Sequence, residues 1–392
     1  MYDSEIEWII DAAPPTLTAI GPEIRGCPNI IIQMKESLLN DDRHDDGNIA
    51  GSDAAYIANR DMSEFELIDR LAAFGVAENL KNAESVLTGI GDDAAVVSTP
   101  SGELLLTTDA IVDGVHFRSA DERWYDIGWK CAVSNLSDIA AMGGIPDHAL
   151  VTLGVPKGVS AETFSDFYSG MNEAFAQFGG RVVGGDVVSS PTMFINLALT
   201  GHPSQTRDGV SAWLRRDAAR TGDLVCVTGP LGGSAGGLEV LLSGDTNPSG
   251  QVLVDRHFHP TPRLEIGKLL VESGVLCAMD VSDGLIGDLE KLARASNVGI
   301  AVEMADIPVP TELIFMFGTS AIDLALGGGE DYELVFTTTE AIHKTLSSAL
   351  GPDIQVIGRV TEGTVPTGEV KVFDATGAVY EPVRKGWDHL DV

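Results

Sequence analysis

The sequence predicts a globular protein of two mixed α/β domains, and three observations support this fold class. With 392 residues, the chain is long enough for two hydrophobic cores. Hydrophobic residues make up 44% of it, charged residues only 21%, and 44 glycines provide for many tight turns, which is typical of a globular chain rather than a disordered or fibrous one. Short apolar runs also alternate with segments of helical spacing, as they do where strands and helices alternate.

The expected elements begin near Met62. Ser63 precedes Glu66 by three residues, which is the spacing of a capping box, and one face of the helix that it opens would be lined by Phe65, Leu67, Ile68, Leu71 and Phe74. The apolar runs expected as strands are Glu103–Thr107, Ala149–Val155, Arg181–Val183, Thr192–Gly201, Leu224–Thr228, Val275–Met279 and Tyr332–Thr337. The segments expected as helices are Trp124–Met142, Ala161–Phe178, Leu285–Ser296 and the one that follows Gly229–Gly237.

The chain is expected to divide into three parts. Residues 1–61 contain Pro14 and Pro15 and an acidic, polar run at 40–48 with little periodicity, so they are predicted to be an acidic, disordered N-terminal extension. A second series of strands and helices begins near Arg215. We therefore expect an N-terminal domain over residues 62–204 and a C-terminal domain over residues 205–392.

The charge of the chain argues against two classes of partner. Its 58 acidic and 25 basic residues give a formal net charge of -33, and such a surface repels both nucleic acid and anionic membranes. The chain begins without the basic segment of a signal peptide, and no apolar stretch reaches the roughly 18 residues of a membrane span. Its four cysteines form no CxxC pair. We therefore expect a cytoplasmic protein with free thiols.

Acidic and hydroxyl side chains recur where apolar segments are expected to end. The segments concerned are Gly89–Asp93, Leu104–Asp109, Val183–Asp186, Asp280–Gly284 and Gly327–Asp331. Taken singly, an Asp after a Gly is typical of a turn or a helix N-cap. Asp138 is different, because it follows Asn135 by three residues in an otherwise apolar helix, where a carboxylate is costly to bury without a partner. Together these oxygen donors predict a Mg²⁺ site; the His and Cys residues lack the spacing of zinc ligands.

The common phosphate-binding motifs are missing. The sequence contains neither GxxxxGK[ST] nor the HRD and DFG motifs of protein kinases. The loop Gly229–Gly237 has two interpretations: the first N–H groups of the helix that it opens could bind an anion, or its glycines could allow close packing of helix on strand. Any ATP site is therefore expected to be of another design.

These motifs resemble those of the thiamine-monophosphate kinase family, within the superfamily typified by aminoimidazole ribonucleotide synthetase. The resemblance runs from about Met62 to the C-terminus. The segments that carry it are GIGDDAA at 89–95, TTDAIVDGVHF at 107–117, KCAVSNLSDIAAMGG at 130–144, GGD at 184–186, DVSDGL at 280–285, GGEDYEL at 328–334 and KGWDH at 385–389. The segments at 328–334 and 385–389 are the ones typical of the kinase.

The resemblance implies an α/β (α+β) protein with the two-domain aminoimidazole ribonucleotide synthetase-like fold, whose N-terminal domain pairs with its twin in a homodimer. It implies an enzyme that transfers the γ-phosphate of ATP to thiamine monophosphate, giving thiamine diphosphate, with several Mg²⁺ ions. The alternative is another ATP-dependent synthetase of the superfamily, of the purine-pathway or selenophosphate type. Selenophosphate synthetase usually offers a reactive Cys or selenocysteine and a Lys near its start, and no such pair is seen here. A non-catalytic acidic metal-binding protein is disfavoured, because its acids would be spread over the surface.

The resemblance also implies roles for individual residues. The metal ligands would be Asp93, Thr107, Thr108, Asp109, Asp138, Asp186 and Asp280, with Asp283 for a further ion. The nucleotide would contact Gly185, Asp186, Arg216 and Ser282, with Tyr168 from the preceding helix. The acceptor would contact His116, Glu330 and Trp387. Of these, His116 has the alternative of a packed core histidine, and Trp387 is either a platform for a cationic ring or an aromatic that closes the core.

No catalytic residue is implied, because the acceptor phosphate is already largely dianionic and needs no general base. We therefore expect direct in-line transfer without a covalent phosphoenzyme. Two features depart from the family pattern. Val187 and Val188 follow Asp186 where family members often have a hydroxyl residue, and Arg215 stands beside Arg216, so either could reach the nucleotide.

Overall fold

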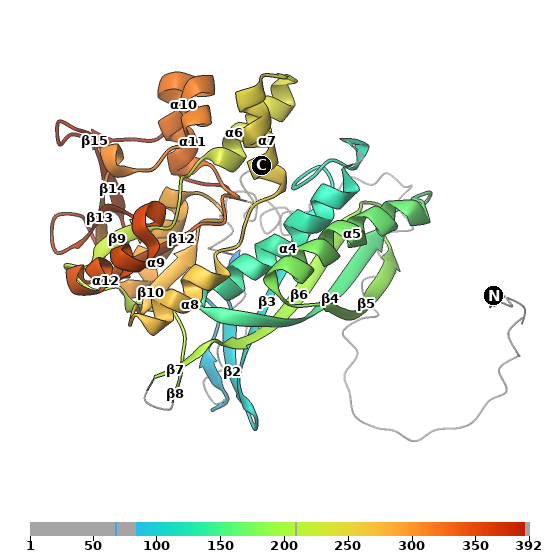
Figure 1. Ribbon diagram of the computed structural model, residues 1–392, viewed down its shortest axis with the longest axis horizontal. Coiled ribbons are helices and arrows are strands. Elements are labelled where there is room, and N and C mark those ends of the chain that lie inside the picture. The colour runs from blue at the N-terminus through green and yellow to red at the C-terminus, as the bar shows by residue number, and fades with distance from the viewer. Residues whose placement is uncertain (1–66, 69–83, 122, 208–209, 389–392) are drawn as a thin grey trace, which may run out of the picture. The chain divides into compact units, whose positions relative to one another are not determined.

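The computed structural model of the protein describes residues 67–68, 84–121, 123–207 and 210–388 (Figure 1). The chain separates into two units, Met1–Asn59 and Arg60–Val392, and all of the described residues belong to the second. The expected N-terminal extension therefore lies outside the described residues. So does most of the first expected helix, of which Leu67 and Ile68 are helical.

Residues 86–203 form a six-stranded sheet, called the first sheet, with the order β1-β2-β3-β6-β4-β5. Its strands are β1 (Val86–Thr88), β2 (Ala95–Thr99), β3 (Gly102–Val112), β4 (Gly144–Val155), β5 (Val182–Ser189) and β6 (Phe194–Pro203). Strands β4 and β5 pair in parallel, and the other neighbours pair antiparallel. Helices α4 (Trp124–Ala141) and α5 (Ala161–Phe178) lie across one face of this sheet (Figure 1).

The burial pattern of β6 shows which face of this sheet packs against the helices. Ile195, Leu197 and Leu199 are buried, whereas the residues between them are only partly buried. This period of two is that of a strand with one face toward a core.

Helices α4 and α5 approach closely because each carries a glycine where they meet. A Cβ atom on Gly128 would lie 1.9 Å from the backbone oxygen of Phe167, and one on Gly170 would lie 1.9 Å from that of Tyr125. Helix α4 also contacts α8 (Leu264–Glu272) and β10 (Cys277–Asp280) of the second half of the chain. Side chains of α4 can therefore meet residues of both halves.

Residues 224–380 contain a seven-stranded sheet, the second sheet, with the order β10-β12-β9-β13-β11-β14-β15. Besides β10, its strands are β9 (Leu224–Val227), β11 (Gly299–Glu303), β12 (Leu334–Thr338), β13 (Gln355–Thr361), β14 (Val370–Phe373) and β15 (Val379–Tyr380). Strands β11 and β14 pair in parallel and the others antiparallel. The remaining helices of this half are α6 (Gly233–Ser243), α7 (Pro248–Phe258), α9 (Leu285–Ser296), α10 (Thr311–Phe317), α11 (Ala321–Gly327) and α12 (Glu340–Leu350).

Both faces of the central strands are covered, so every residue of β9, β10 and β12 is buried. Leu224, Cys226 and Phe336 belong to the hydrophobic core that also contains the buried residues of the first sheet. Val225 and Val335 face the other way and share a second core with α9. This explains why Leu224–Val227 is apolar without alternation.

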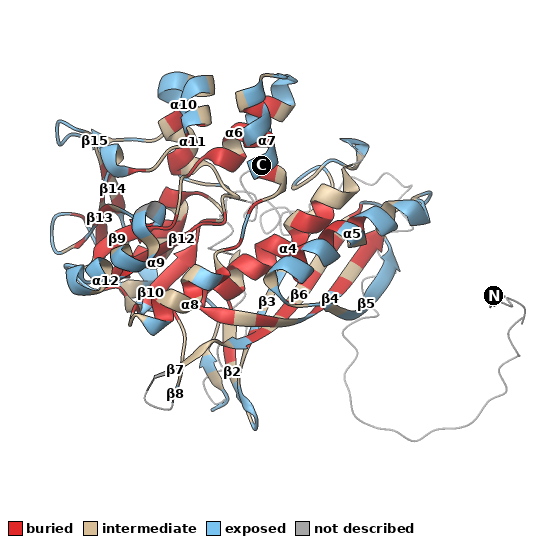
Figure 2. Ribbon diagram, viewed as in Figure 1, coloured by how far each residue is buried: buried red, intermediate tan, exposed pale blue. Residues whose placement is uncertain are grey.

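A two-stranded ribbon, β7 (Gln205–Arg207) and β8 (Val210–Ala212), follows the first sheet. Short 3₁₀ segments occur at Ser119–Asp121, Arg216–Ala218, Met304–Asp306, Gly318–Ser320 and Gly351–Asp353. Helix α4 and the central strands β9, β10 and β12 are largely buried, whereas α10 and α12 have one buried residue each (Figure 2).

The predicted mixed α/β architecture is confirmed, and helices α5 and α9 have the predicted bounds. Several predicted strand ends are wrong; β4, for example, begins at Gly144 and not at Ala149. Strand β3 continues through Thr107–Asp109 to Val112, and β5 continues through Gly184–Asp186 to Ser189, because backbone pairing with β6 and β4 continues past the polar side chains. The domain boundary at 204/205 stays a prediction.

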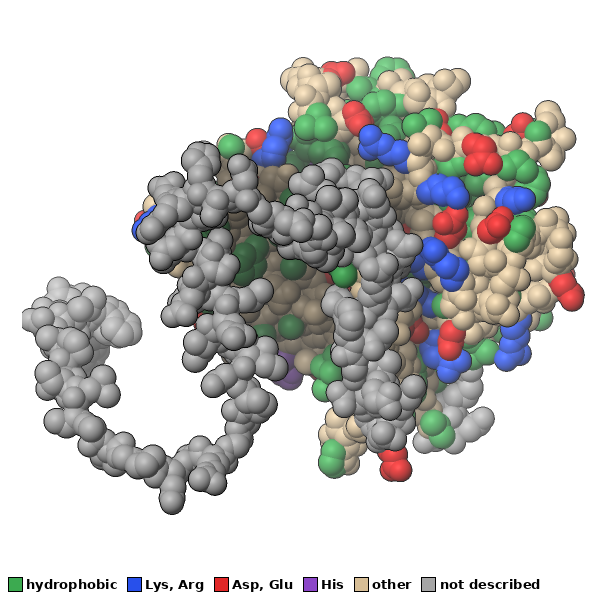
Figure 3. Space-filling model, turned by 180° about the vertical axis from the view of Figure 1, so that it is seen from behind, with side chains coloured by type: hydrophobic (Ala, Val, Ile, Leu, Met, Phe, Trp, Pro, Cys, Tyr) green, Lys and Arg blue, Asp and Glu red, His purple; other side chains and the backbone are tan. Residues whose placement is uncertain are grey.

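Among the described helices, none is long and apolar enough to cross a bilayer. Seen from behind, acidic and basic side chains are interspersed on the part of the surface that is not grey (Figure 3).

Candidate functional site

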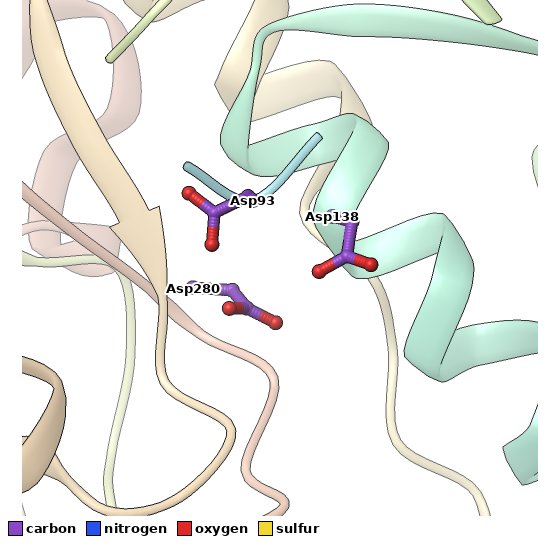
Figure 4. Close-up of side chains that lie close together, drawn as sticks. All are labelled: Asp93, Asp138 and Asp280. Carbon is purple, nitrogen blue, oxygen red and sulfur yellow. The ribbon is translucent and has the colours of Figure 1, made fainter. Parts of the chain in front are cut away.

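Three carboxylates from distant parts of the chain converge on one point. Asp93 lies in the turn between β1 and β2, Asp138 on α4, and Asp280 is the last residue of β10. One oxygen from each lies within 4.8 Å of the others. Figure 4 shows the three side chains directed toward a common space.

Neighbouring hydroxyl and amide groups orient these carboxylates. The Thr107 hydroxyl donates to Asp138 Oδ2, and the Ser137 hydroxyl donates to Asp280 Oδ2 at 2.7 Å. Asn135 on the same helix accepts from the backbone N–H of Asp109 at 3.2 Å. Helix α4 therefore provides three polar residues at this site: Asp138 and Asn135, which were predicted, and Ser137, which was not.

Without a bound cation, the ionised forms of these clustered carboxylates are unfavourable. Burial, followed by the neighbouring carboxylates, raises the pKa of Asp138 and of Asp280 well above the usual range. Burial and Asp93 raise the pKa of Asp92 to about 7. Asp93 Oδ2 is buried and has no hydrogen-bond partner among the described residues. Three converging carboxylates with one unpartnered oxygen suit a hard divalent cation.

Arg216 is the one cation of the Arg215–Arg216 pair that points into this cluster. Its Nη2 lies 2.5 Å from Asp93 Oδ1, and its backbone N–H lies 3.3 Å from Asp92 Oδ2. Arg215 is exposed and pairs with Asp217 at 2.8 Å. The Nε of Arg216 has no partner among the described residues, so it has a donor to offer.

The strand register separates the other predicted metal ligands onto two faces of the first sheet. Asp109 pairs with Leu197, which is buried toward the helices, so Asp109 shares the face of Asp138. Thr108 pairs with Ala198, and its hydroxyl contacts Asn196 on the opposite face. Asp186 is exposed on the edge strand β5 and pairs with Thr152, which in turn pairs with Asn196. The structure therefore does not bring Thr108 and Asp186 to the cluster within one chain.

Asp283 and Ser282 lie in a turn that α9 anchors. Asp288, in the first turn of α9, accepts the backbone N–H groups of Ser282 at 3.0 Å, Asp283 at 3.1 Å and Gly284 at 3.2 Å. Lys291 pairs with both Asp283 and Asp288. Asp288 and Lys291 were not predicted from the sequence, although their spacing of three on a predicted helix could have indicated the pair.

A second polar cluster surrounds Glu330, in the loop before β12. Lys130 Nζ on α4 lies 2.6 Å from Glu330 Oε2, and His257 Nδ1 on α7 lies 3.7 Å from the same oxygen. Burial raises the pKa of Glu330, but the charge and hydrogen bond of the Lys130 ammonium, together with the nearby imidazoles of His257 and His116, outweigh burial, so the net shift is downward. Lys130 and His257 were not predicted, and only the place of Lys130 at the start of the 130–144 motif could have pointed to it.

The structure places the remaining predicted residues as follows. His116 Nδ1 accepts the backbone N–H of Val112 at 3.1 Å, so a neutral imidazole carries its proton on Nε2. Trp387 is 43% exposed, which disfavours the interpretation that it closes the core, and its backbone N–H donates to the backbone oxygen of Asp283 at 2.9 Å. Tyr168 is half-buried on α5 against the ring of Phe167. Gly185 is in β5, where a Cβ would lie 1.9 Å from the backbone oxygen of Val151.

The loop Gly229–Gly237 serves packing rather than anion binding. Asp331 accepts the backbone N–H groups of Gly232 at 2.5 Å and Ser234 at 3.0 Å, so these groups at the start of α6 are already occupied. A Cβ on Gly237 would lie 2.2 Å from the backbone oxygen of Leu253 on α7. Of the two interpretations of this loop, the structure supports close packing.

The chain resembles known proteins over most of its length. The family model described as AIR synthase related protein, N-terminal domain, matches residues 91–202, and the one described as AIR synthase related protein, C-terminal domain, matches residues 220–371. The thiamine-monophosphate kinase of Aquifex aeolicus (strain VF5) is 36% identical over 337 residues, which are 84% of this chain and 99% of that protein. The thiamine-monophosphate kinase of Bacillus subtilis (strain 168) is 34% identical over 84% of this chain and 100% of its own length.

Solved structures show the same likeness. AaThiL complexed with AMPPCP and TMP matches with a TM-score of 0.70 and 35% identity, over 83% of this chain and 97% of that chain. The hydrogenase maturation protein HypE in complex with ATP matches with a TM-score of 0.60 over 83% of this chain and 96% of that chain. At 19% identity, the second likeness shows a shared fold only.

Proposed function

The chain belongs to the thiamine-monophosphate kinase family, and from this premise we propose that it transfers the γ-phosphate of ATP to thiamine monophosphate, giving thiamine diphosphate and ADP. The observation that carries the proposal is the convergence of Asp93, Asp138 and Asp280 within 4.8 Å, because each comes from a different family motif. The relative AaThiL binds AMPPCP, an ATP analogue, together with TMP. The relatives do not favour a purine-pathway or selenophosphate synthetase.

We propose that the carboxylate cluster holds Mg²⁺. Asp93, Asp138 and Asp280 would be its central ligands, with Thr107 and Asp109 beside them, and Asp283 would hold a further ion. The unpartnered Asp93 Oδ2 supports this assignment, as do the raised pKa values of Asp138 and Asp280. Bound there, Mg²⁺ would offset the repulsion between the two reacting phosphate groups and align them in line.

The chain's own residues would hold the two substrates. Arg216 and Ser282 lie near the cluster and are proposed to contact the nucleotide phosphates, Arg216 through its guanidinium donors. His116 would donate from Nε2 to the acceptor. Glu330 would face the cationic thiazolium or the amino group of the pyrimidine, and Trp387 would provide a flat surface for these rings.

No covalent intermediate is proposed. The acceptor phosphate is itself the nucleophile, and its dianion needs no general base. Burial raises the pKa of the Cys226 thiol to about 12 and raises those of Cys131 and Cys277, so none of these three is a thiolate at neutral pH. ATP-dependent synthesis of a coenzyme, together with these free thiols, agrees with a cytoplasmic location.

We propose that the enzyme is a homodimer joined through the first sheet. Leu106, Leu150 and Val188 lie on the face away from α4 and α5 and are 37%, 51% and 40% exposed. Thr108 and Asp186 share this face, which points away from the cluster of their own chain, so in a dimer they would lie at the contact with the second copy. We propose residues 62–204 and 205–392 as the two domains. The first would provide the dimer contact, and the second would complete the substrate site.

The test measures ADP release by the purified protein with ATP and Mg²⁺, with and without thiamine monophosphate, beside Asp138→Asn. We expect thiamine monophosphate to stimulate ADP release in the wild type and the variant to lose it. If ATP is used only with another phosphorylated acceptor, the fold survives and the substrate assignment falls. If the folded wild type does not turn over ATP, the proposal that this protein is an ATP-dependent enzyme is contradicted.

A further inference from the structure

A partly buried ion pair joins the two halves of the chain beside the proposed acceptor site. Lys130 lies on α4, which packs on the first sheet, and Glu330 lies in the loop before β12 of the second sheet. Nζ and Oε2 are 2.6 Å apart, and the side chains are 12% and 31% exposed. An ammonium so far withdrawn from water is costly unless it is paired. The pair therefore fixes both side chains.

The backbone of Glu330 is held in an unusual conformation. Its φ is 66° and that of Tyr332 is 52°, in the left-handed region that residues other than glycine rarely adopt. The N–H of Glu330 donates to Ser282 at 2.7 Å and that of Tyr332 donates to Val281 at 3.0 Å. Such a conformation persists only where the surroundings impose it, so the loop is built to direct Glu330 to one place.

His257 holds Lys130 rather than competing with it. Its Nε2 lies 3.4 Å from Lys130 Nζ, and an ammonium can only donate, so Nε2 is the acceptor and Nδ1 carries the proton. Nδ1 lies 3.0 Å from the Ser234 hydroxyl and 3.7 Å from Glu330 Oε2. Burial, with Lys130 next, lowers the pKa of His257 to about 3, so the imidazole is neutral and leaves Lys130 as the cation of the pair.

We propose that Lys130, supported by His257, is a positioning residue that holds the Glu330 carboxylate in place for the cationic ring system of the acceptor. This inference rests on the proposed function, in which Glu330 contacts that ring system. It adds two roles: Lys130 occupies Oε2 and sets the direction of the carboxylate, and it keeps the carboxylate ionised inside the protein. An acceptor that presents a cationic or amino-bearing heterocycle then meets a fixed negative charge, whereas a neutral analogue does not.

The pH dependence of acceptor binding distinguishes this role from a purely structural one. The charged and titratable groups that face Glu330 are Lys130 from α4, His257 from α7, His116 from the segment after β3, and Tyr332 from its own loop. In Lys130→Met the largest opposing charge is gone, so burial raises the pKa of Glu330 above that in the wild type. Binding of the cationic acceptor to this variant then weakens as pH falls.

The experiment uses the full-length protein in the oligomeric state in which it is purified. It measures KM for thiamine monophosphate, KM for ATP and kcat between pH 6 and pH 9. For Lys130→Met we expect KM for the acceptor to rise about tenfold or more, the effect of losing a hydrogen bond to a charged group. The rise should be larger at pH 6 than at pH 9, with KM for ATP within about twofold of the wild type. Lys130→Arg should recover part of the loss.

Two controls make the result specific. Lys268→Met removes a Lys–Glu pair of similar length, 2.7 Å, whose Glu265 is 87% exposed, and it should leave all constants unchanged. In Glu330→Gln, which cannot titrate, adding Lys130→Met should have little further effect on acceptor KM and none on its pH dependence.

The outcomes separate this inference from the proposed function. A wild type that does not use thiamine monophosphate overturns the function itself. If the wild type uses thiamine monophosphate and a folded Lys130→Met variant has the same acceptor KM and pH profile as the wild type, only the positioning role is contradicted. Equal, pH-independent rises of KM for ATP and for the acceptor also overturn it, because they indicate a general structural fault.

Discussion

Asp138 is the residue at which charge affects both stability and activity. Burial and then the carboxylates of Asp109, Asp280 and Asp93 raise its pKa well above the usual range, so its ionised form destabilises the cation-free fold. We expect Asp138→Asn to lower kcat by more than the roughly 10- to 100-fold typical of outer-shell partners of a metal. In EDTA its Tm should equal or exceed that of the wild type, because the amide oxygen can still accept from Thr107. ADP release and scanning calorimetry measure the two effects.

The matched control is Asp166→Asn, on the exposed side of α5, which should change neither quantity. Wild-type kcat in Asp138→Asn would contradict its role as a ligand. A Tm in EDTA several degrees below that of the wild type would contradict the argument from repulsion.

His257 makes the stability of the fold sensitive to acid. Burial, with Lys130 next, lowers its pKa to about 3, against about 6.5 in the unfolded chain. As pH falls through about 6.5, the unfolded chain takes up a proton that the folded chain does not, so this residue removes up to about 1.4 kcal/mol of stability per pH unit. We expect urea unfolding free energies of His257→Asn to fall less steeply between pH 7 and pH 5 than those of the wild type. Parallel slopes would show that the buried imidazole is not the cause.

At this scale the carboxylates could be predicted from the sequence, whereas their supports could not. Asp138 stands out because a lone acid in an apolar helix requires a partner. His257 sits in an ordinary helical segment, and its contact Lys130 is 127 residues away. Arg216 likewise meets Asp93 across 123 residues. No local spacing reveals contacts that depend on how two sheets are placed around one helix.

The crossing of α4 and α5 is the element on which the position of Asp138 depends. A Cβ on Gly170 would lie 1.9 Å from the backbone oxygen of Tyr125, which cannot move without moving α4. We expect Gly170→Ala to lower the free energy of unfolding by about 1–3 kcal/mol or more, as overpacking does, and to lower kcat as α4 shifts. Urea unfolding and ADP release test this.

Ser169→Ala, at the neighbouring exposed position of α5, should cost no more than about 0.5 kcal/mol. If Gly170→Ala is as stable as Ser169→Ala, the close approach of the two helices is not required.

The segment after β15 is held against α9 and α11, and this contact sets the place of Trp387. The N–H of Gly287 donates to the backbone oxygen of Lys385 at 2.7 Å, and the N–H of Trp387 donates to the backbone oxygen of Asp283 at 2.9 Å. A Cβ on Gly327 would lie 2.3 Å from the backbone oxygen of Arg384 and would push the segment away. Gly327→Ala is therefore expected to raise KM for thiamine monophosphate several-fold while KM for ATP changes by less than about twofold.

Steady-state kinetics with each substrate varied in turn check this expectation, with Ser320→Ala at the start of α11 as the control. A rise of similar size in both KM values would mean that the variant disturbs the whole site and not the place of Trp387.

Among the elements, helices were predicted better than strand ends. The apolar spacing of α5 and α9 spans the whole of each helix, so their bounds follow from the sequence. The ends of β3 and β5 did not follow, because Thr107–Asp109 and Gly184–Asp186 look like turn residues and yet remain paired with β6 and β4. These residues are polar because they face candidate binding sites, and not because the strand pairing ends there.

At the scale of the whole molecule, the alternation of strands and helices was enough to predict two mixed α/β halves, but not how they share a site. Helix α4 contacts β10 and α8 as well as the first sheet, and this shared helix brings Asp138 to Asp280. The sequence contains the residues of the site, and only the packing of α4 between the two sheets shows that one site is formed from both halves.

The open face of the first sheet is where the dimer proposal can be tested. Leu150 is 51% exposed on this face, on β4, which pairs with both β5 and β6. In a two-fold interface each substitution occurs twice, so Leu150→Asp buries two carboxylates in an apolar contact and should give a monomer. Because Asp186 lies on the same face, the monomer should also lose ADP release.

Light scattering after size exclusion gives the mass, with Val210→Asp, at a 67% exposed valine of β8, as the control. A Leu150→Asp protein with the mass and activity of a wild-type dimer would exclude this face as the interface, and a monomeric, active wild type would exclude the dimer.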